Sequence, residues 1–103
     1  MSTVAQRAVK AVIEYDGTAF AGSQVQPNAR TVQGELEKAL NRLIGERTRV
    51  RLAGRTDAGV HATGQVASFC LPRRDRGEEV GWDAVRQRLN AVLPSDLAVR
   101  SLR

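Results

Sequence analysis

The order of apolar periodicities is the feature that most constrains the fold of this chain. Four short stretches are rich in β-branched residues or alternate between apolar and polar residues, as strands do, and two longer ones carry apolar residues at helical spacing. The strand-like stretches are residues 8–15, 47–53, 65–71 and 97–103, and the helical ones are residues 32–44 and 82–93. The order β-α-β-β-α-β predicts an α+β, ferredoxin-like fold, in which two helices cover one face of a four-stranded antiparallel sheet.

Local signals agree with these boundaries. Thr31 precedes the first helical stretch as a plausible N-cap, and Gly45 follows it as a C-terminal stop. Pro72 ends the third strand-like stretch, and Pro94 ends the second helix. The charged residues 73–79 have the composition of a linker and predict an exposed loop.

The size and composition indicate one compact domain. The chain has 103 residues, of which 42% are apolar, so it can bury a core. Cys70 is the single cysteine; its place in an apolar run predicts a buried, unreactive thiol in a reducing compartment. No apolar run approaches the roughly 20 residues needed to span a bilayer, so a soluble, cytoplasmic protein without a membrane partner is expected.

The charge balance favours a polyanionic partner. Sixteen Lys and Arg residues against eleven Asp and Glu residues give a net charge of +5, and only Lys10 and Lys38 of the sixteen are lysines. Guanidinium groups pair well with phosphate, although a GC-rich coding preference would also favour arginine. If Val50, Leu52, Leu97 and Val99 face the helices, the residues predicted on the uncovered face are Arg49, Arg51 and Arg100, together with Lys10. Such a face suits a phosphate backbone or another protein domain.

The loop at residues 54–64 carries the most reactive candidate. Asp57 lies between two predicted strands, two positions after Arg55, in a segment punctuated by Gly54, Gly59 and Gly64. Glycines let a backbone approach a ligand closely, and a neighbouring guanidinium would keep Asp57 ionised as a nucleophile or base. The structural alternative is an aspartate that caps a turn and is held by an arginine.

Other chemistries have less support in the sequence. His61 is the only histidine, and with Cys70 and scattered carboxylates it does not provide a metal-ligand set, so no metal site is predicted. We interpret it as a loop residue whose side chain forms a hydrogen bond. The glycine-rich stretch lacks the Lys-Ser/Thr ending of a phosphate-binding P-loop. Trp82, at helical spacing, is interpreted as a core residue.

Several short motifs follow one another along almost the whole chain. They are Tyr15-Asp16-Gly17-Thr18, Phe20, Gly22, Gln24, Gln26-Pro27-Asn28, Thr31-Val32-Gln33, Leu36-Glu37, Ala53 to Ala62, Gly64-Gln65-Val66, Leu89-Asn90, Leu93-Pro94 and Asp96-Leu97-Ala98-Val99. In this order they resemble the TruA family of tRNA pseudouridine synthases. The resemblance implies conversion of uridine to pseudouridine at positions 38 to 40 of the tRNA anticodon stem-loop, without a cofactor or metal.

The resemblance also assigns roles to residues. Asp57 falls at the family's catalytic aspartate, which assists cleavage of the glycosidic bond of a flipped nucleotide, either by covalent addition or by proton abstraction. Arg55 falls at the motif arginine and would support that nucleotide and pair with Asp57. The motif residues Gln24, Gln65 and His61 are further candidates for RNA contact.

Two departures from the family pattern limit this transfer. Ser23 occupies a position where the family commonly has tryptophan. Family members are usually about twice as long, with a second, similar domain that supplies a tyrosine stacking on the uracil. Residues 1–103 are therefore expected to form an N-terminal domain that lacks its C-terminal partner and has little activity alone. The full-length family form is a homodimer that binds tRNA across both subunits.

Two other classes of function remain open from the sequence. A non-catalytic RNA-binding module would bind tRNA in a salt-sensitive way whatever residue stood at position 57. A ferredoxin-like domain used in protein assembly would neither bind tRNA nor isomerise uridine.

Overall fold

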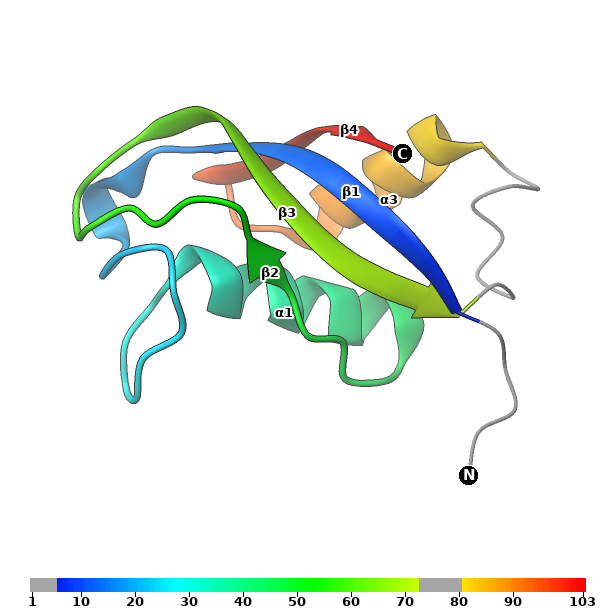
Figure 1. Ribbon diagram of the computed structural model, residues 1–103, viewed down its shortest axis with the longest axis horizontal. Coiled ribbons are helices and arrows are strands. Elements are labelled where there is room, and N and C mark those ends of the chain that lie inside the picture. The colour runs from blue at the N-terminus through cyan, green and yellow to red at the C-terminus, as the bar shows by residue number, and fades with distance from the viewer. Residues whose placement is uncertain (1–5, 73–80) are drawn as a thin grey trace.

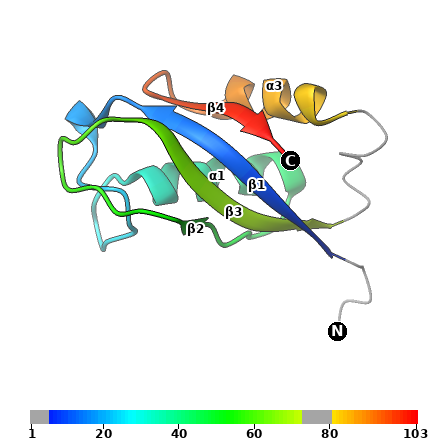
Figure 2. The same ribbon diagram turned by 45° about the horizontal axis from the view of Figure 1, so that its top comes forward.

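In a computed structural model, which describes residues 6–72 and 81–103, one antiparallel sheet carries two helices on the same face (Figures 1 and 2). The strands run in the spatial order β2-β3-β1-β4. Their bounds are β1 Gln6–Tyr15, β2 Arg51–Leu52, β3 Ala62–Pro72 and β4 Leu97–Leu102. The helices are α1 Val32–Ile44 and α3 Trp82–Val92, and a short 3-10 turn, η1, covers Gly17–Ala19. The predicted α+β, ferredoxin-like arrangement is confirmed.

The core lies between the sheet and the helices. Alternate residues of β1 are buried, and they face buried residues of the neighbouring strands: Val9 is opposite Phe69, and Ile13 is opposite Val99. Leu36 of α1 and Leu89 of α3 are both almost completely buried beneath them. The other face of the sheet carries no helix, so the strand residues that alternate with the buried ones face solvent.

Strand β2 is shorter than predicted. The sequence pattern predicts a strand over residues 47–53, but only Arg51 and Leu52 pair with β3. Side chains of α1 replace the missing pairing: the Val50 N–H donates to a Glu37 carboxylate oxygen at 2.8 Å, and the Val50 carbonyl accepts from the Gln33 amide at 2.9 Å. The alternation of faces is nevertheless as predicted, since Val50 is buried whereas Arg49 and Arg51 are exposed.

The prediction for Cys70 is wrong. The apolar run at residues 65–71 predicted that Cys70 is buried, but helices cover only one face of the sheet. In β3, Phe69 and Leu71 point into the core, and Cys70 between them is exposed. Trp82 is half-buried and packs against the core, as expected, with the Arg7 guanidinium 5.4 Å from its ring centroid.

The predicted ends of the first helix are confirmed. The Thr31 hydroxyl accepts a hydrogen bond from the Gly34 N–H at 3.1 Å, and Gly45 is the C-cap of α1. The predicted loop at residues 73–79 lies outside the described residues. Within the described ranges, no helix is long and apolar enough to cross a membrane.

Candidate active site

The loop that carries Asp57 connects β2 to β3. Hydrogen bonds to Thr56, the residue before the aspartate, hold this loop in place. The Thr56 N–H donates to the Ser23 hydroxyl at 2.8 Å, and the Ser23 N–H donates to the Thr56 carbonyl at 2.9 Å. The Thr56 hydroxyl also lies 2.8 Å from the Tyr15 hydroxyl. Three hydrogen bonds therefore hold Thr56, and they leave the next side chain, Asp57, exposed.

The remainder of the loop follows the segment between β1 and α1. The Gly59 N–H donates to the Phe20 carbonyl at 3.2 Å, and the Gly17 N–H donates to His61 Nδ1 at 2.8 Å. A Cβ atom on Gly17 would overlap the carbonyl oxygen of Val60, so only glycine allows the two segments to approach this closely. The predicted loop hydrogen bond of His61 is present.

Gln65 braces the start of the loop. Its amide accepts from the Gly54 N–H at 2.9 Å and donates to the Gly54 carbonyl at 2.9 Å. Both ends of the side-chain amide are thus engaged by the protein backbone. Gln65 therefore holds the loop in place. If Gln65 also contacts RNA, as predicted, the RNA must bind an amide atom that is already hydrogen-bonded to Gly54.

Asp57 lines an open hollow of about 560 Å³. The hollow is formed by the Asp57 loop and by residues that follow η1; its lining residues are Ala21, Gly22, Ser23, Gln24, Gln26, Arg55, Thr56, Asp57 and Ala58. The structure therefore brings together three of the predicted site residues, Asp57, Arg55 and Gln24. It also adds Gln26, whose amide donates to the Ala21 carbonyl at 2.6 Å and whose motif membership was the only signal in the sequence.

Asp57 and Arg55 do not form the expected pair. Both side chains are exposed, and neither an ion pair nor a hydrogen bond joins them. The Asp57 carboxylate and the Arg55 guanidinium are therefore both free to contact a ligand in the hollow. Among the described residues, no group of three or more His, Cys, Asp or Glu side chains could hold a metal ion.

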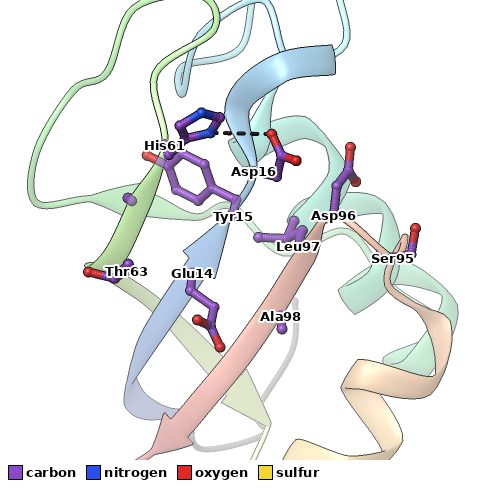
Figure 3. Close-up of a pocket in the computed structure, with 10 residues that line it drawn as sticks. Glu14, Tyr15, Asp16, His61, Thr63, Ser95, Asp96, Leu97 and Ala98 are labelled. Atoms are coloured by element: carbon purple, nitrogen blue, oxygen red, sulfur yellow. Dashed lines mark ion pairs between the residues drawn. The ribbon is translucent and has the colours of Figure 1, made fainter.

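A second hollow, of about 530 Å³, lies beside His61 (Figure 3). His61 Nδ1 is 3.2 Å from an Asp16 carboxylate oxygen, and Glu14 and Asp96 line the same space. Hydrogen bonds from the Thr18 hydroxyl and N–H lower the pKa of Asp16. Glu14 and Asp16 line this hollow without a guanidinium partner among the described residues, which is unfavourable for a phosphate group, whereas the Asp57 hollow also carries the Arg55 guanidinium. The Asp57 hollow is therefore the better candidate for an RNA site.

An ion pair joins the segment before α1 to the start of β4. Two nitrogens of the Arg30 guanidinium bind the two Asp96 carboxylate oxygens, each at 2.8 Å, and this lowers the pKa of Asp96. The guanidinium carbon also lies 4.2 Å from the ring centroid of Phe20. Arg30 belongs to the segment between β1 and α1 that contacts the Asp57 loop, so the ion pair attaches this segment to the sheet.

The three arginines predicted on the open face of the sheet are exposed there, outside the Asp57 hollow. Arg49 and Arg51 line a separate hollow with Ser68. Arg100 of β4 reaches across β1, where its guanidinium donates to the Thr63 carbonyl of β3 at 2.6 Å. The structure does not bring these residues to Asp57.

Comparison with known proteins identifies the family. A sequence model described as tRNA pseudouridine synthase matches residues 11–103. The chain belongs to the tRNA pseudouridine synthase family. The tRNA pseudouridine synthase A of Geobacter sp. strain M21 is 53% identical over 94 residues, covering 91% of this chain and 36% of the relative. That of Thermosipho melanesiensis is 57% identical over 86 residues, or 84% of this chain and 34% of the relative. That of Chloroflexus aurantiacus is 51% identical over 96 residues, which cover 93% of this chain and 33% of the relative. The chain thus spans about a third of the length of these pseudouridine synthases.

Proposed function

We propose that this chain is the catalytic-aspartate part of a tRNA pseudouridine synthase that converts uridine to pseudouridine at positions 38 to 40 of the anticodon stem-loop. The observation that carries the proposal is the exposed Asp57 carboxylate in an open hollow, on a loop whose preceding residue, Thr56, is held by three hydrogen bonds. Membership of the tRNA pseudouridine synthase family supports it.

The hollow suits a nucleotide that has left its stack. An enzyme that rearranges a base must reach atoms that are buried within a helix, so the target nucleotide is flipped out. Asp57 would then act at the sugar and base, as a nucleophile or as a base toward the ribose, while the N-glycosidic bond is cleaved. The uracil turns and rejoins C1′ of the ribose through carbon, so that uridine and pseudouridine have the same atoms. The Arg55 guanidinium would bind the phosphate of the flipped nucleotide, and Gln24 could hydrogen-bond to its base.

The site requires more protein than this chain provides. The Asp57 hollow is open, and the chain corresponds to 33% to 37% of the length of its relatives. A closed, dry site is needed to hold a flipped base and to strengthen electrostatic interactions. We therefore interpret residues 1–103 as an N-terminal domain whose C-terminal partner completes the cleft. Efficient isomerisation is expected of the two together, with the complete enzyme acting as a homodimer.

The test joins this chain to the C-terminal remainder of the Geobacter relative and measures pseudouridine in a tRNA transcript by mass spectrometry. Asp57→Asn keeps the size of the side chain and removes its charge. We expect turnover to fall by at least about 10³-fold, as for other nucleophiles and bases, while tRNA affinity changes by less than about twofold.

Asp83→Asn, which removes an exposed carboxylate on α3, is the matched control and should keep full turnover. Undiminished isomerisation by the Asp57→Asn enzyme would exclude the catalytic role. Efficient isomerisation by the 103-residue chain alone would show that the site is already complete.

A further inference from the structure

His61 attaches the end of the Asp57 loop to the segment that follows β1. Its Nδ1 atom accepts a hydrogen bond from the buried Gly17 N–H at 2.8 Å. The residue before it, Val60, donates its N–H to the Asp57 carbonyl at 3.1 Å, so a single turn joins His61 to the candidate catalytic aspartate. The hydrogen bond between His61 and Gly17 therefore holds this turn in place.

This hydrogen bond requires one protonation state of the imidazole ring. A backbone N–H can only donate, so Nδ1 must present a lone pair, and the neutral ring then carries its hydrogen on Nε2. A doubly protonated ring has no lone pair and cannot accept from Gly17. Among the described residues, the Gly17 N–H has no other acceptor. Protonation of His61 thus leaves a buried donor unpaired, which is unfavourable.

A carboxylate oxygen lies beside the same ring nitrogen (Figure 3). Asp16 Oδ1 is 3.2 Å from His61 Nδ1, and it accepts hydrogen bonds from the Thr18 hydroxyl at 2.6 Å and from the Thr18 N–H at 3.0 Å. These two hydrogen bonds lower the pKa of Asp16, so its carboxylate is ionised at neutral pH. While the ring is neutral, two acceptors face each other; once Nδ1 carries a proton, Asp16 is its partner.

Further charged and titratable groups surround the ring from β1, from β4 and from the residue before β4. They are Glu14, Tyr15, Asp96 and Arg100, the last through its hydrogen bond to the Thr63 carbonyl in the same hollow. Asp96 is bound to the Arg30 guanidinium, and the Tyr15 hydroxyl is 2.8 Å from that of Thr56. Among the described residues, Glu14 is therefore the second carboxylate of the hollow without a guanidinium partner, and a test must separate its effect from that of Asp16.

We propose that His61 is a positioning residue of the Asp57 loop that acts only as the neutral ring with its hydrogen on Nε2. A proton added to Nδ1 moves this nitrogen from the Gly17 N–H to the Asp16 carboxylate, and the end of the loop is released. The side chain is 63% exposed, so solvent protons reach it. Histidine changes its charge between about pH 5 and 8, so the loop responds to pH in this range. The consequence for uridine turnover rests on the proposed function.

The test follows the ¹⁵N-labelled 103-residue chain by NMR from about pH 8 to about pH 5. His61 is the only histidine, so its ring signals can be assigned directly. We expect the neutral ring to carry its hydrogen on Nε2. As the ring is protonated, the protection factor of the Gly17 amide against hydrogen exchange should fall by at least about tenfold, because its acceptor is lost. Protection factors within α1 should stay constant.

His61→Asn separates the acceptor from its titration. The asparagine oxygen lies about where Nδ1 was and does not titrate, so Gly17 should stay protected at every pH. His61→Ala removes the acceptor and should lower Gly17 protection throughout. Asp16→Asn removes the charged partner of the protonated ring and should move the transition to lower pH. Its matched control, Glu14→Gln, removes a carboxylate that lines the same hollow but forms no ion pair with the ring, and should move the transition less.

Four results would each overturn the proposal. They are a neutral ring with its hydrogen on Nδ1, Gly17 protection that stays constant while the ring titrates, a pH dependence that persists in His61→Asn, and equal shifts for Asp16→Asn and Glu14→Gln. The last result would mean that the acidic hollow attracts a proton in general, without a specific contact between His61 and Asp16.

Turnover by the complete enzyme, joined as described above, gives a second readout. The kcat of the unchanged enzyme should fall as the pH is lowered through the Gly17 transition, and this component of the pH profile should be absent from His61→Asn. The NMR readout needs no isomerisation, so the two proposals fail separately. If Gly17 protection follows His61 protonation but Asp57→Asn keeps full turnover, only the catalytic role is wrong. If Asp57→Asn abolishes turnover but Gly17 protection ignores His61 protonation, only the inference about His61 is wrong.

Discussion

Ser23 and Thr56 hold each other through two reciprocal hydrogen bonds, although 33 positions separate them in the sequence. The Ser23 hydroxyl accepts from the Thr56 N–H at 2.8 Å, and the Ser23 N–H donates to the Thr56 carbonyl at 2.9 Å. Ser23 is only 1% exposed, so water cannot readily replace either bond. Because Asp57 follows Thr56 directly, this pair determines where the carboxylate stands relative to the hollow.

Ser23→Ala should loosen the Asp57 loop. The substitution removes the acceptor of the Thr56 N–H and leaves that donor unpaired in a partly buried position, which costs about 1–3 kcal/mol. We expect the free energy of unfolding in urea to fall by about that amount. Amide hydrogen exchange of Thr56 should also accelerate more than exchange in α1.

Ser95→Ala is the matched control for the serine substitution. Ser95 is exposed, and its hydroxyl takes part in no hydrogen bond among the described residues. Its removal should change the free energy of unfolding by less than about 0.5 kcal/mol. Equal losses for the two variants would mean that the Ser23 hydroxyl does not stabilise the loop.

Tyr15 and Thr56 should show an energetic coupling of their own. Their hydroxyl oxygens are 2.8 Å apart, and Tyr15 is 5% exposed. Tyr15→Phe and Thr56→Val each remove one hydroxyl with little change in shape. In a double-mutant cycle measured by urea denaturation, we expect a coupling free energy of about 0.5–1.5 kcal/mol. Strictly additive losses would argue against a direct bond between the two hydroxyls.

Gly17→Ala should be poorly tolerated, whereas Gly64→Ala should not. The new methyl group on residue 17 would overlap the Val60 carbonyl and push the loop away, which we expect to destabilise the chain by about 1–3 kcal/mol. No atom lies within 4 Å of a Cβ built on Gly64. Thermal unfolding monitored by circular dichroism should show a large decrease in Tm only for Gly17→Ala, and similar decreases for both would contradict the close approach.

The fold was largely predictable because local patterns and long-range packing agree. Apolar spacing and the Thr31 cap specify α1, and alternation specifies the buried side of β1. The length of β2 was not predictable, because Glu37 and Gln33 of α1 bind the backbone of Val50 and so replace strand pairing. Cys70 was misplaced because an apolar run does not reveal whether one or both faces of its strand are covered.

The candidate site was predictable only where its residues are close in sequence. Asp57 and Arg55 stand out in a single glycine-punctuated loop, but the residues that hold this loop come from the segment between β1 and α1. Ser23 was visible only as a departure from the family pattern, and its contact with Thr56 depends on the tertiary fold. The anchoring of the loop therefore could not be inferred from spacing.

The pair between Arg30 and Asp96 should make stability depend on pH in the acid range. The Arg30 guanidinium holds the pKa of Asp96 below its ordinary value of 3.8. A carboxyl group with a lowered pKa in the folded state contributes stability that is fully present above the unfolded pKa. That contribution is lost as the pH falls through the folded pKa, when the folded carboxylate is protonated.

Asp96→Asn tests this pH dependence, because it removes the titrating group and keeps its shape. The Asp96 and Arg30 side chains are 23% and 36% exposed, so solvent screening limits the contribution to about 0.5–1 kcal/mol at neutral pH. The difference in unfolding free energy between the unchanged chain and the variant should have this size at pH 7 and shrink toward zero as the pH falls through the lowered pKa of Asp96. Arg30→Lys keeps the charge but loses the two-nitrogen geometry, so it should lose most of the same stability. A difference that stayed constant from neutral to acid pH would show that the ionised pair does not stabilise the fold.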